Sequence, residues 1–89
     1  RKKTIKYLEQ ESSKTGKCQI FMETPYRNRA MAESLLKHCH GDTLICFAIE
    51  LTSKNECILT KTDNRWKRGL PELHNKPVIF LIQANSSHI

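Results

Sequence analysis

Residues 43–60 read TLICFAIELTSKNECILT, and this stretch decides the fold. Residues 43–51 are almost continuously apolar, which is typical of a central strand covered on both faces. Residues 52–55 are polar, and residues 56–60 return to a composition typical of a strand. We therefore predict a β-hairpin with a four-residue loop near the middle of a sheet.

Two further apolar runs extend this sheet. Residues 18–22 lie between Gly16 and Pro25, and residues 77–83 begin at a proline and stay apolar almost to their end. Both runs have strand length and are bounded by residues that interrupt regular structure. Together with the hairpin they predict about four strands.

Helices are expected between these strands. Apolar residues recur three or four apart within 3–12 and within 25–38, which indicates one apolar face in each segment. Thr24 is expected to supply a capping oxygen, because Pro25 fits the first helical position that follows it. Thr62 and Asp63 can cap a short third helix.

This order of elements predicts an α/β fold. We expect a single small domain with a mixed, mostly buried sheet of about four strands and helices packed on it. The domain should cover residues 1–84, and residues 85–89 should form a frayed tail. The chain has 89 residues and starts at Arg1, not Met, so we expect it to be part of a longer protein. No apolar run is long enough for a membrane span, and no signal peptide is recognised.

The chain is basic, with a formal net charge of +6. Lys and Arg exceed Asp and Glu within residues 1–17 and again within residues 54–76. Two basic segments could converge on a phosphate backbone, or they could serve only solubility. Trp66 lies inside the second segment, where it could stack on a base, but covering the end of a small core is the favoured interpretation.

The four cysteines do not predict a metal centre. No C-x-x-C motif occurs, so a structural zinc site has little support. The run His38-Cys39-His40 is not expected to bind a metal, because adjacent helical residues point in different directions. Cys18 and Cys46 lie in apolar runs and should act as small hydrophobic residues. We expect reduced thiols in a cytoplasmic protein.

Two polar segments end strands and are candidates for a binding site. Residues 23–28 follow the first strand, and residues 50–52 follow the second. If these strands are parallel, both segments lie at one edge of the sheet, where α/β proteins bind ligands. The first segment could instead be only a capping turn. Arg27 is the expected partner of Glu50, either as a structural clamp or as part of a ligand wall.

The same two segments resemble motifs of the tetrapyrrole methylase superfamily. Residues 20–28, IFMETPYRN, are similar to Phe-Glu-Ala-Pro-His-Arg in the branch that methylates a ribose 2′-hydroxyl of small-subunit ribosomal RNA, and Thr24 and Tyr26 are departures from it. Residues 50–52 match part of that branch's Arg-Glu-Leu-Thr-Lys motif, with Ile49 in place of the arginine. The resemblance covers nearly the whole chain.

The resemblance implies the carboxy-terminal domain of a two-domain methyltransferase that uses S-adenosylmethionine and no metal. This domain would form one wall of the cofactor cleft, and it would be inactive without the amino-terminal domain. The resemblance implies that six positions correspond to the cofactor wall: Glu23, Thr24, Arg27, Glu50, Leu51 and Thr52. The resemblance also implies a homodimer and a ribosomal RNA substrate.

Other functions remain open on the sequence alone. The chain could be a basic RNA-binding module without catalysis, or a methyltransferase domain acting on a tetrapyrrole or another small molecule. It could also be a dimerisation domain in which the matching motifs serve only packing.

Overall fold

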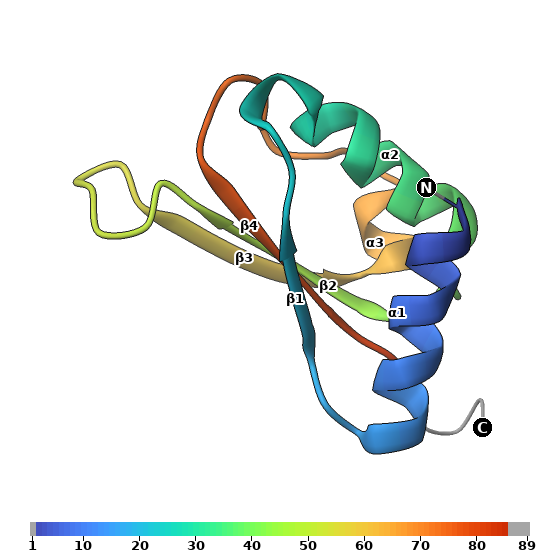
Figure 1. Cartoon of the computed structure of the whole chain (residues 1–89). Helices are drawn as coiled ribbons and strands as arrows, with labels where there is room; N and C mark the ends of the chain where they lie inside the picture. Colours follow the sequence, from blue (N-terminus) through green and yellow to red (C-terminus); the bar gives the residue numbers. More distant parts are fainter. Residues whose placement is uncertain (1, 86–89) are drawn as a thin grey trace.

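The computed structural model describes residues 2–85 and contains three α-helices, one 3-10 helix and four strands within them (Figure 1). In chain order these are α1 (Lys2–Thr15), β1 (Gln19–Met22), η1 (Pro25–Arg27), α2 (Asn28–His38), β2 (Leu44–Ile49), β3 (Cys57–Thr62), α3 (Asp63–Trp66) and β4 (Val78–Gln83). The expected α/β domain with four strands and packed helices is therefore confirmed. The expected tail at 85–89 lies, apart from Asn85, outside the described residues. No helix within residues 2–85 is long and apolar enough to cross a membrane.

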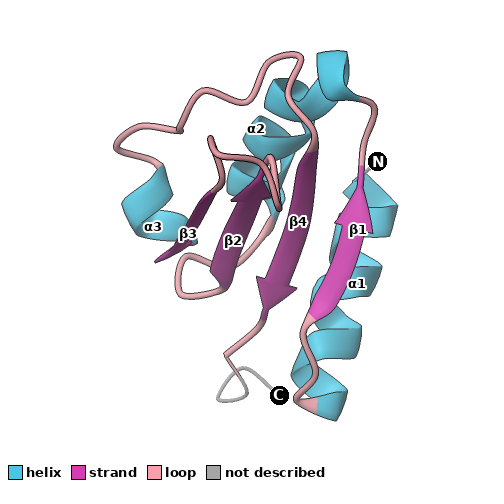
Figure 2. Cartoon of the chain, turned by 90° about the vertical axis from the view of Figure 1, so that its left-hand side faces the viewer, coloured by secondary structure: helices cyan, strands magenta, loops and turns pink. Residues whose placement is uncertain are grey.

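The strands form one sheet in the order β1-β4-β2-β3. Each neighbouring pair is antiparallel, so the expectation of a mixed sheet was wrong. The last strand, β4, inserts between β1 and β2 and runs opposite to both. As a result β1 and β2 point in the same direction without being hydrogen-bonded neighbours (Figure 2).

A row of large apolar side chains crosses the sheet and forms the core. The register places Phe21 opposite Phe80, and Phe80 opposite Phe47. Phe21 and Phe80 stack with ring centroids 5.2 Å apart, whereas Phe47 meets Phe80 edge-on at 5.6 Å. Trp66 of α3 packs against Phe47 at 4.8 Å, also edge-on. These are favourable aromatic geometries, and they join three strands to α3.

Trp66 is a core residue, as the favoured interpretation held. Its side chain is 2% exposed, and Nε1 donates a hydrogen bond to the Ile45 carbonyl oxygen at 2.7 Å. Thr62 caps α3 as expected, because its Oγ1 accepts a hydrogen bond from the Arg65 amide at 3.3 Å. The side chain of Trp66 is therefore not available for stacking on a nucleic-acid base.

The hairpin between β2 and β3 is confirmed, but its loop is longer than expected. β2 ends at Ile49 and β3 begins at Cys57, so residues 50–56 form the loop. Glu50 adopts a left-handed φ of 52°, and its amide bonds to the Pro77 carbonyl oxygen at 2.8 Å. This change of backbone direction ends the strand before Leu51.

Only one face of the sheet is covered by helices. α1, α2 and α3 all lie on the same side of the strands (Figures 1 and 2). The other face, here called the open face, carries large exposed side chains, including Ile20 and Met22, which are 65% and 66% exposed. The prediction of a mostly buried sheet was therefore wrong for this face, because residues 2–85 contain no helix that packs on it.

Local differences from the predicted helices have identifiable causes. Thr24 makes no side-chain cap, and the chain first forms a 3-10 turn at Pro25–Arg27 before α2 begins. α1 continues to Thr15 and stops at Gly16, whose φ of 72° suits glycine. The buried Ser12 does not break α1, because its Oγ accepts a hydrogen bond from the Ala84 amide at 2.8 Å.

We predict that Trp66→Phe lowers the free energy of unfolding by about 1–3 kcal/mol, because the buried Ile45 carbonyl loses its donor. The measurement is urea unfolding followed by circular dichroism. Arg65→Ala on the exposed side of the same helix is the control and should change stability by less than about 0.5 kcal/mol. Equal stability of Trp66→Phe and the unchanged protein would contradict this account.

Candidate functional site

The two candidate segments lie at one edge of the sheet, as the sequence suggested. Glu23 follows the last residue of β1, and Glu50 follows the last residue of β2. Both strands run the same way, so their carboxyl ends meet the same edge, here called the strand-end edge (Figure 2). One strand lies between them, which separates the two ends by roughly 10 Å.

The turn after β1 is held rigidly against the segment that leads into β4. Asn28 is fully buried, and its Nδ2 donates hydrogen bonds to the carbonyl oxygens of Leu73 at 3.0 Å and Lys76 at 2.7 Å. The Asn75 amide also bonds to the Pro25 carbonyl oxygen at 3.1 Å. Asn28 was not among the site residues expected from sequence, although it belongs to the motif at 20–28. Its contacts join residues far apart in the chain, which no local pattern reveals.

Within this turn the three predicted residues remain accessible to a ligand. Glu23 is half-buried, and its Oε1 accepts a hydrogen bond from the Thr24 amide at 3.0 Å. Thr24 and Arg27 are exposed. The segment after β1 therefore contains the Glu23 carboxylate just before the 3-10 turn and the Arg27 guanidinium at the end of that turn.

The second segment contains strained backbone. Thr52 is β-branched and has a φ of 66°, a conformation that such residues rarely adopt. Its amide bonds to Glu56 Oε1 at 2.7 Å, and its hydroxyl bonds to the Leu51 carbonyl oxygen at 2.6 Å. Glu50, with its own left-handed φ, precedes it. Strain of this kind is concentrated at functional sites and supports a functional role for residues 50–52.

The expected pairing of Arg27 with Glu50 is not observed. Within residues 2–85 no ion pair joins them, because they leave strands that are separated by β4. The clamp interpretation was therefore wrong. The strand-end edge instead offers separate carboxylates at its two ends, with backbone groups of the β4 approach between them.

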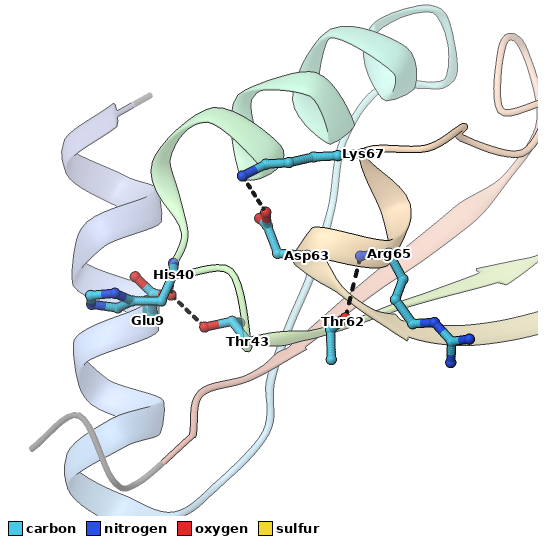
Figure 3. Close-up of polar contacts among 7 residues, drawn as sticks. All are labelled: Glu9, His40, Thr43, Thr62, Asp63, Arg65 and Lys67. Atoms are coloured by element: carbon cyan, nitrogen blue, oxygen red, sulfur yellow. Dashed lines mark hydrogen bonds and ion pairs between the residues drawn. The ribbon is translucent and has the colours of Figure 1, made fainter.

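A second polar cluster is buried between α1 and the turn before β2, and Figure 3 shows it. Glu9 is 4% exposed, and its Oε2 accepts hydrogen bonds from the His40 amide, at 2.7 Å, and from the Thr43 hydroxyl. Nearby, the fully buried Asp63 pairs with Lys67 Nζ at 3.2 Å. Burial raises the pKa of the Asp63 carboxyl, and Lys67 opposes that shift. The Glu9 contacts join α1 to the turn before β2, and the Asp63–Lys67 pair lies within α3 and its C-terminal cap.

The run His38-Cys39-His40 lies at the end of α2, and Cys39 is buried there. Burial, followed by the negative charge of Glu9, raises the pKa of the Cys39 thiol to about 12. A thiol with this pKa stays protonated near neutral pH, whereas metals bind the thiolate. Within residues 2–85 no three His, Cys, Asp or Glu side chains are placed to hold a metal ion together.

All four cysteines are free thiols, but their environments differ from those expected. Cys18 is exposed and Cys46 is partly buried on the open face, so neither is enclosed as a core residue. Burial and the nearby Cys46 raise the pKa of the Cys18 thiol. Both were expected to act as small hydrophobic residues, but neither lies in the core, because no helix of residues 2–85 covers that face.

Comparison with solved structures finds a crystal structure of the methyltransferase CobJ, with a TM-score of 0.56 and 19% sequence identity. The match covers 91% of this chain and 34% of that chain, so this chain spans about a third of the methyltransferase. No protein-family model and no curated protein matches the sequence. At 19% identity the likeness shows the fold, which is that of a domain found in a methyltransferase.

We predict that Asn28→Ala loosens the strand-end edge and lowers the free energy of unfolding by about 2–3 kcal/mol, because two carbonyl groups lose their buried donor. The measurement is urea unfolding. Arg27→Ala, one residue earlier but exposed, should change stability by less than about 0.5 kcal/mol. Similar effects of the two variants would contradict the bracing role of Asn28.

We also predict that Cys39 resists alkylation by iodoacetamide at pH 8. Its pKa of about 12 leaves roughly one thiolate in ten thousand, and its side chain is buried. The exposed Cys57 should react about a hundredfold faster or more. Peptide mass spectrometry over a time course distinguishes the two, and modification of Cys39 before Cys57 in the folded protein would show that the prediction is wrong.

Proposed function

We propose that this chain is the carboxy-terminal domain of a methyltransferase of the tetrapyrrole methylase superfamily and forms one wall of an S-adenosylmethionine site. The observation that carries the proposal is that both motif-bearing segments end at the same edge of a fold shared with a methyltransferase. Glu23 and Glu50 are half-buried there, and Thr52 is held in a strained conformation.

The residues at the strand-end edge suit a nucleoside-type ligand. The carboxylates of Glu23 and Glu50 can accept hydrogen bonds from hydroxyl or amino groups. The strand ends that carry these residues are roughly 10 Å apart, which suits an elongated molecule. Leu51 and Thr52 are exposed beside Glu50 and can add contacts. S-adenosylmethionine, when bound, supplies an electrophilic methyl group, and these side chains orient the donor beside its acceptor.

The proposed role of this domain is to position the reactants. Methyl transfer to a hydroxyl is a direct displacement, so its rate depends mainly on alignment of donor and acceptor and on exclusion of water. An open edge cannot exclude water by itself. We therefore infer that an amino-terminal domain of the same protein supplies the opposite wall, and that this chain alone is inactive.

We propose ribosomal RNA as the substrate and the cytoplasm as the location. The motif at 20–28 and the net charge of +6 support an RNA substrate, because phosphates attract Lys and Arg. A tetrapyrrole or another small molecule is the second candidate, supported by the family resemblance and the fold. The alternative of a basic RNA-binding module without catalysis explains the positive net charge. It does not explain the strained backbone of residues 50–52.

We further propose that the open face joins two copies of the protein. Ile20, Met22 and Ile58 are each more than half exposed on this face. An extended apolar patch of this kind usually marks an interface. A homodimer would cover it without obstructing the strand-end edge.

The proposal is tested by calorimetric titration of S-adenosylhomocysteine into the intact protein as its gene encodes it. Glu23→Ala should weaken binding about tenfold or more, because a hydrogen bond to a charged group is lost. Glu33→Ala removes the same charge from an exposed position on α2 and is the control. An unaffected affinity in Glu23→Ala would remove this turn from the site, and no binding by the intact protein would overturn the methyltransferase proposal.

The dimer proposal predicts that Ile58→Lys converts the intact protein from dimer to monomer in sedimentation equilibrium, because a charge cannot be buried unpaired in the interface. Tyr7→Lys is the control, since Tyr7 is 61% exposed on α1 and lies away from the open face. A dimer that survives Ile58→Lys, or a monomeric unchanged protein, would contradict the proposed interface.

A further inference from the structure

A cationic cavity lies between the edge strand β3 and the short helix α3. Its volume is about 470 Å³, and it is lined by Thr60, Lys61, Arg65, Arg68 and Gly69. Three of these five residues are cations, and none is acidic. The cavity is formed by the second basic segment alone, because no residue of 1–17 lines it.

The three cations of this cavity have no acidic partner among residues 2–85. Within residues 2–85 no ion pair involves Lys61, Arg65 or Arg68. Lys67, in the same stretch of chain, is by contrast paired with the buried Asp63. Figure 3 shows Arg65 and Lys67 leaving α3 in different directions, with only Lys67 directed toward Asp63. The chain therefore neutralises the cation on one side of α3 and leaves the cavity side positively charged.

Neighbouring contacts fix where these cations lie. Lys61 Nζ lies 4.7 Å from the centre of the Trp66 ring, in a cation–π contact with a buried residue. The Thr62 cap fixes the start of α3, and the Arg68 amide continues the turn with a hydrogen bond to the Arg65 carbonyl oxygen at 3.2 Å. These contacts fix the backbone from which the three cations that line the cavity extend.

Space and charge in the cavity both suit an anion. No atom lies within 4 Å of the position that a Cβ on Gly69 would occupy, so this wall is open. Like charges brought together without a counter-charge repel one another, and a bound anion removes that repulsion. Arginine side chains bind phosphate oxygens through paired N–H groups, which makes phosphate the best match.

We propose that this cavity binds the phosphodiester backbone of a single-stranded nucleic acid. The cavity is open and lies on an edge strand, so a nucleic-acid strand can enter on one side and leave on the other. A closed pocket would admit only a short ligand. The burial of Trp66 excludes base stacking by that residue, so recognition here rests on phosphate contacts and is independent of sequence.

The cavity is distinct from the strand-end edge. Thr62 is paired with Leu44 at the start of β2, whereas Ile49 at the end of β2 is paired with Cys57. Lys61 therefore lies roughly 14 Å along the strand from the row that borders the strand-end edge. The proposed phosphate site does not depend on methyl transfer, and it holds or fails separately from the cofactor proposal.

The test is fluorescence anisotropy of the intact protein with a labelled oligouridylate of about 12 nucleotides, measured between roughly 50 and 200 mM KCl. The double variant Arg65→Ala/Arg68→Ala should bind about tenfold more weakly or worse. It should also reduce the slope of log affinity against log salt by about 0.7 for each cation removed. Both side chains are exposed, so the variant should fold, which thermal unfolding checks.

The matched control is Lys14→Ala/Lys37→Ala, which removes the same charge from exposed positions on α1 and α2. It should change the affinity by no more than about twofold. An equal loss in control and test variants would show diffuse attraction and overturn the proposal. Absence of oligouridylate binding by the unchanged protein would also overturn it.

Two further measurements distinguish the phosphodiester site from a free-anion site and from the cofactor site. Calorimetric titration with inorganic phosphate should show only weak binding, and tight phosphate binding without oligouridylate binding would assign the cavity to a free anion instead. The double variant should bind S-adenosylhomocysteine as the unchanged protein does. Oligouridylate binding that survives in Glu23→Ala while cofactor binding falls would support two separate sites.

Discussion

The contact on which the rest of the structure depends is the packing of Phe47 between Phe80 and Trp66. Phe47 lies on the central strand β2, and all three rings are almost completely buried. This contact fixes β4 beside β2 and places α3 against the same face, so it sets both the strand order and the side on which helices pack. The hydrogen bond from Trp66 to Ile45 satisfies the one polar group of that aromatic cluster.

Insertion of β4 between β1 and β2 has a direct functional consequence. It makes the first two strands run the same way, so two motif segments far apart in sequence reach one edge of the sheet. It also keeps them apart, which is why Arg27 and Glu50 do not pair. In the proposed cofactor site, the two separated carboxylates and the strained backbone near Glu50 would contact an extended ligand.

The exposed groups of the molecule differ from one region to another. Helices cover one face of the sheet, and the open face keeps large apolar side chains accessible. The strand-end edge carries the acidic candidates, whereas β3, α3 and the turn after α3 carry the three cations of the cavity. Three different chemistries therefore occupy three different parts of a small domain, so a substitution in one of them can be interpreted separately.

The sequence by itself determined the order of helices and strands, the β2–β3 hairpin, the Thr62 cap and the burial of Trp66, because periodicity and capping chemistry are local. It also identified the two polar segments at the strand ends. Only the tertiary structure decided that β4 is central, that one face stays open, that Asn28 braces the first turn and that three cations share a cavity. These features depend on which distant segments pack together. The sequence pattern of an apolar run such as 18–22 does not show whether one face of the strand is covered or both are.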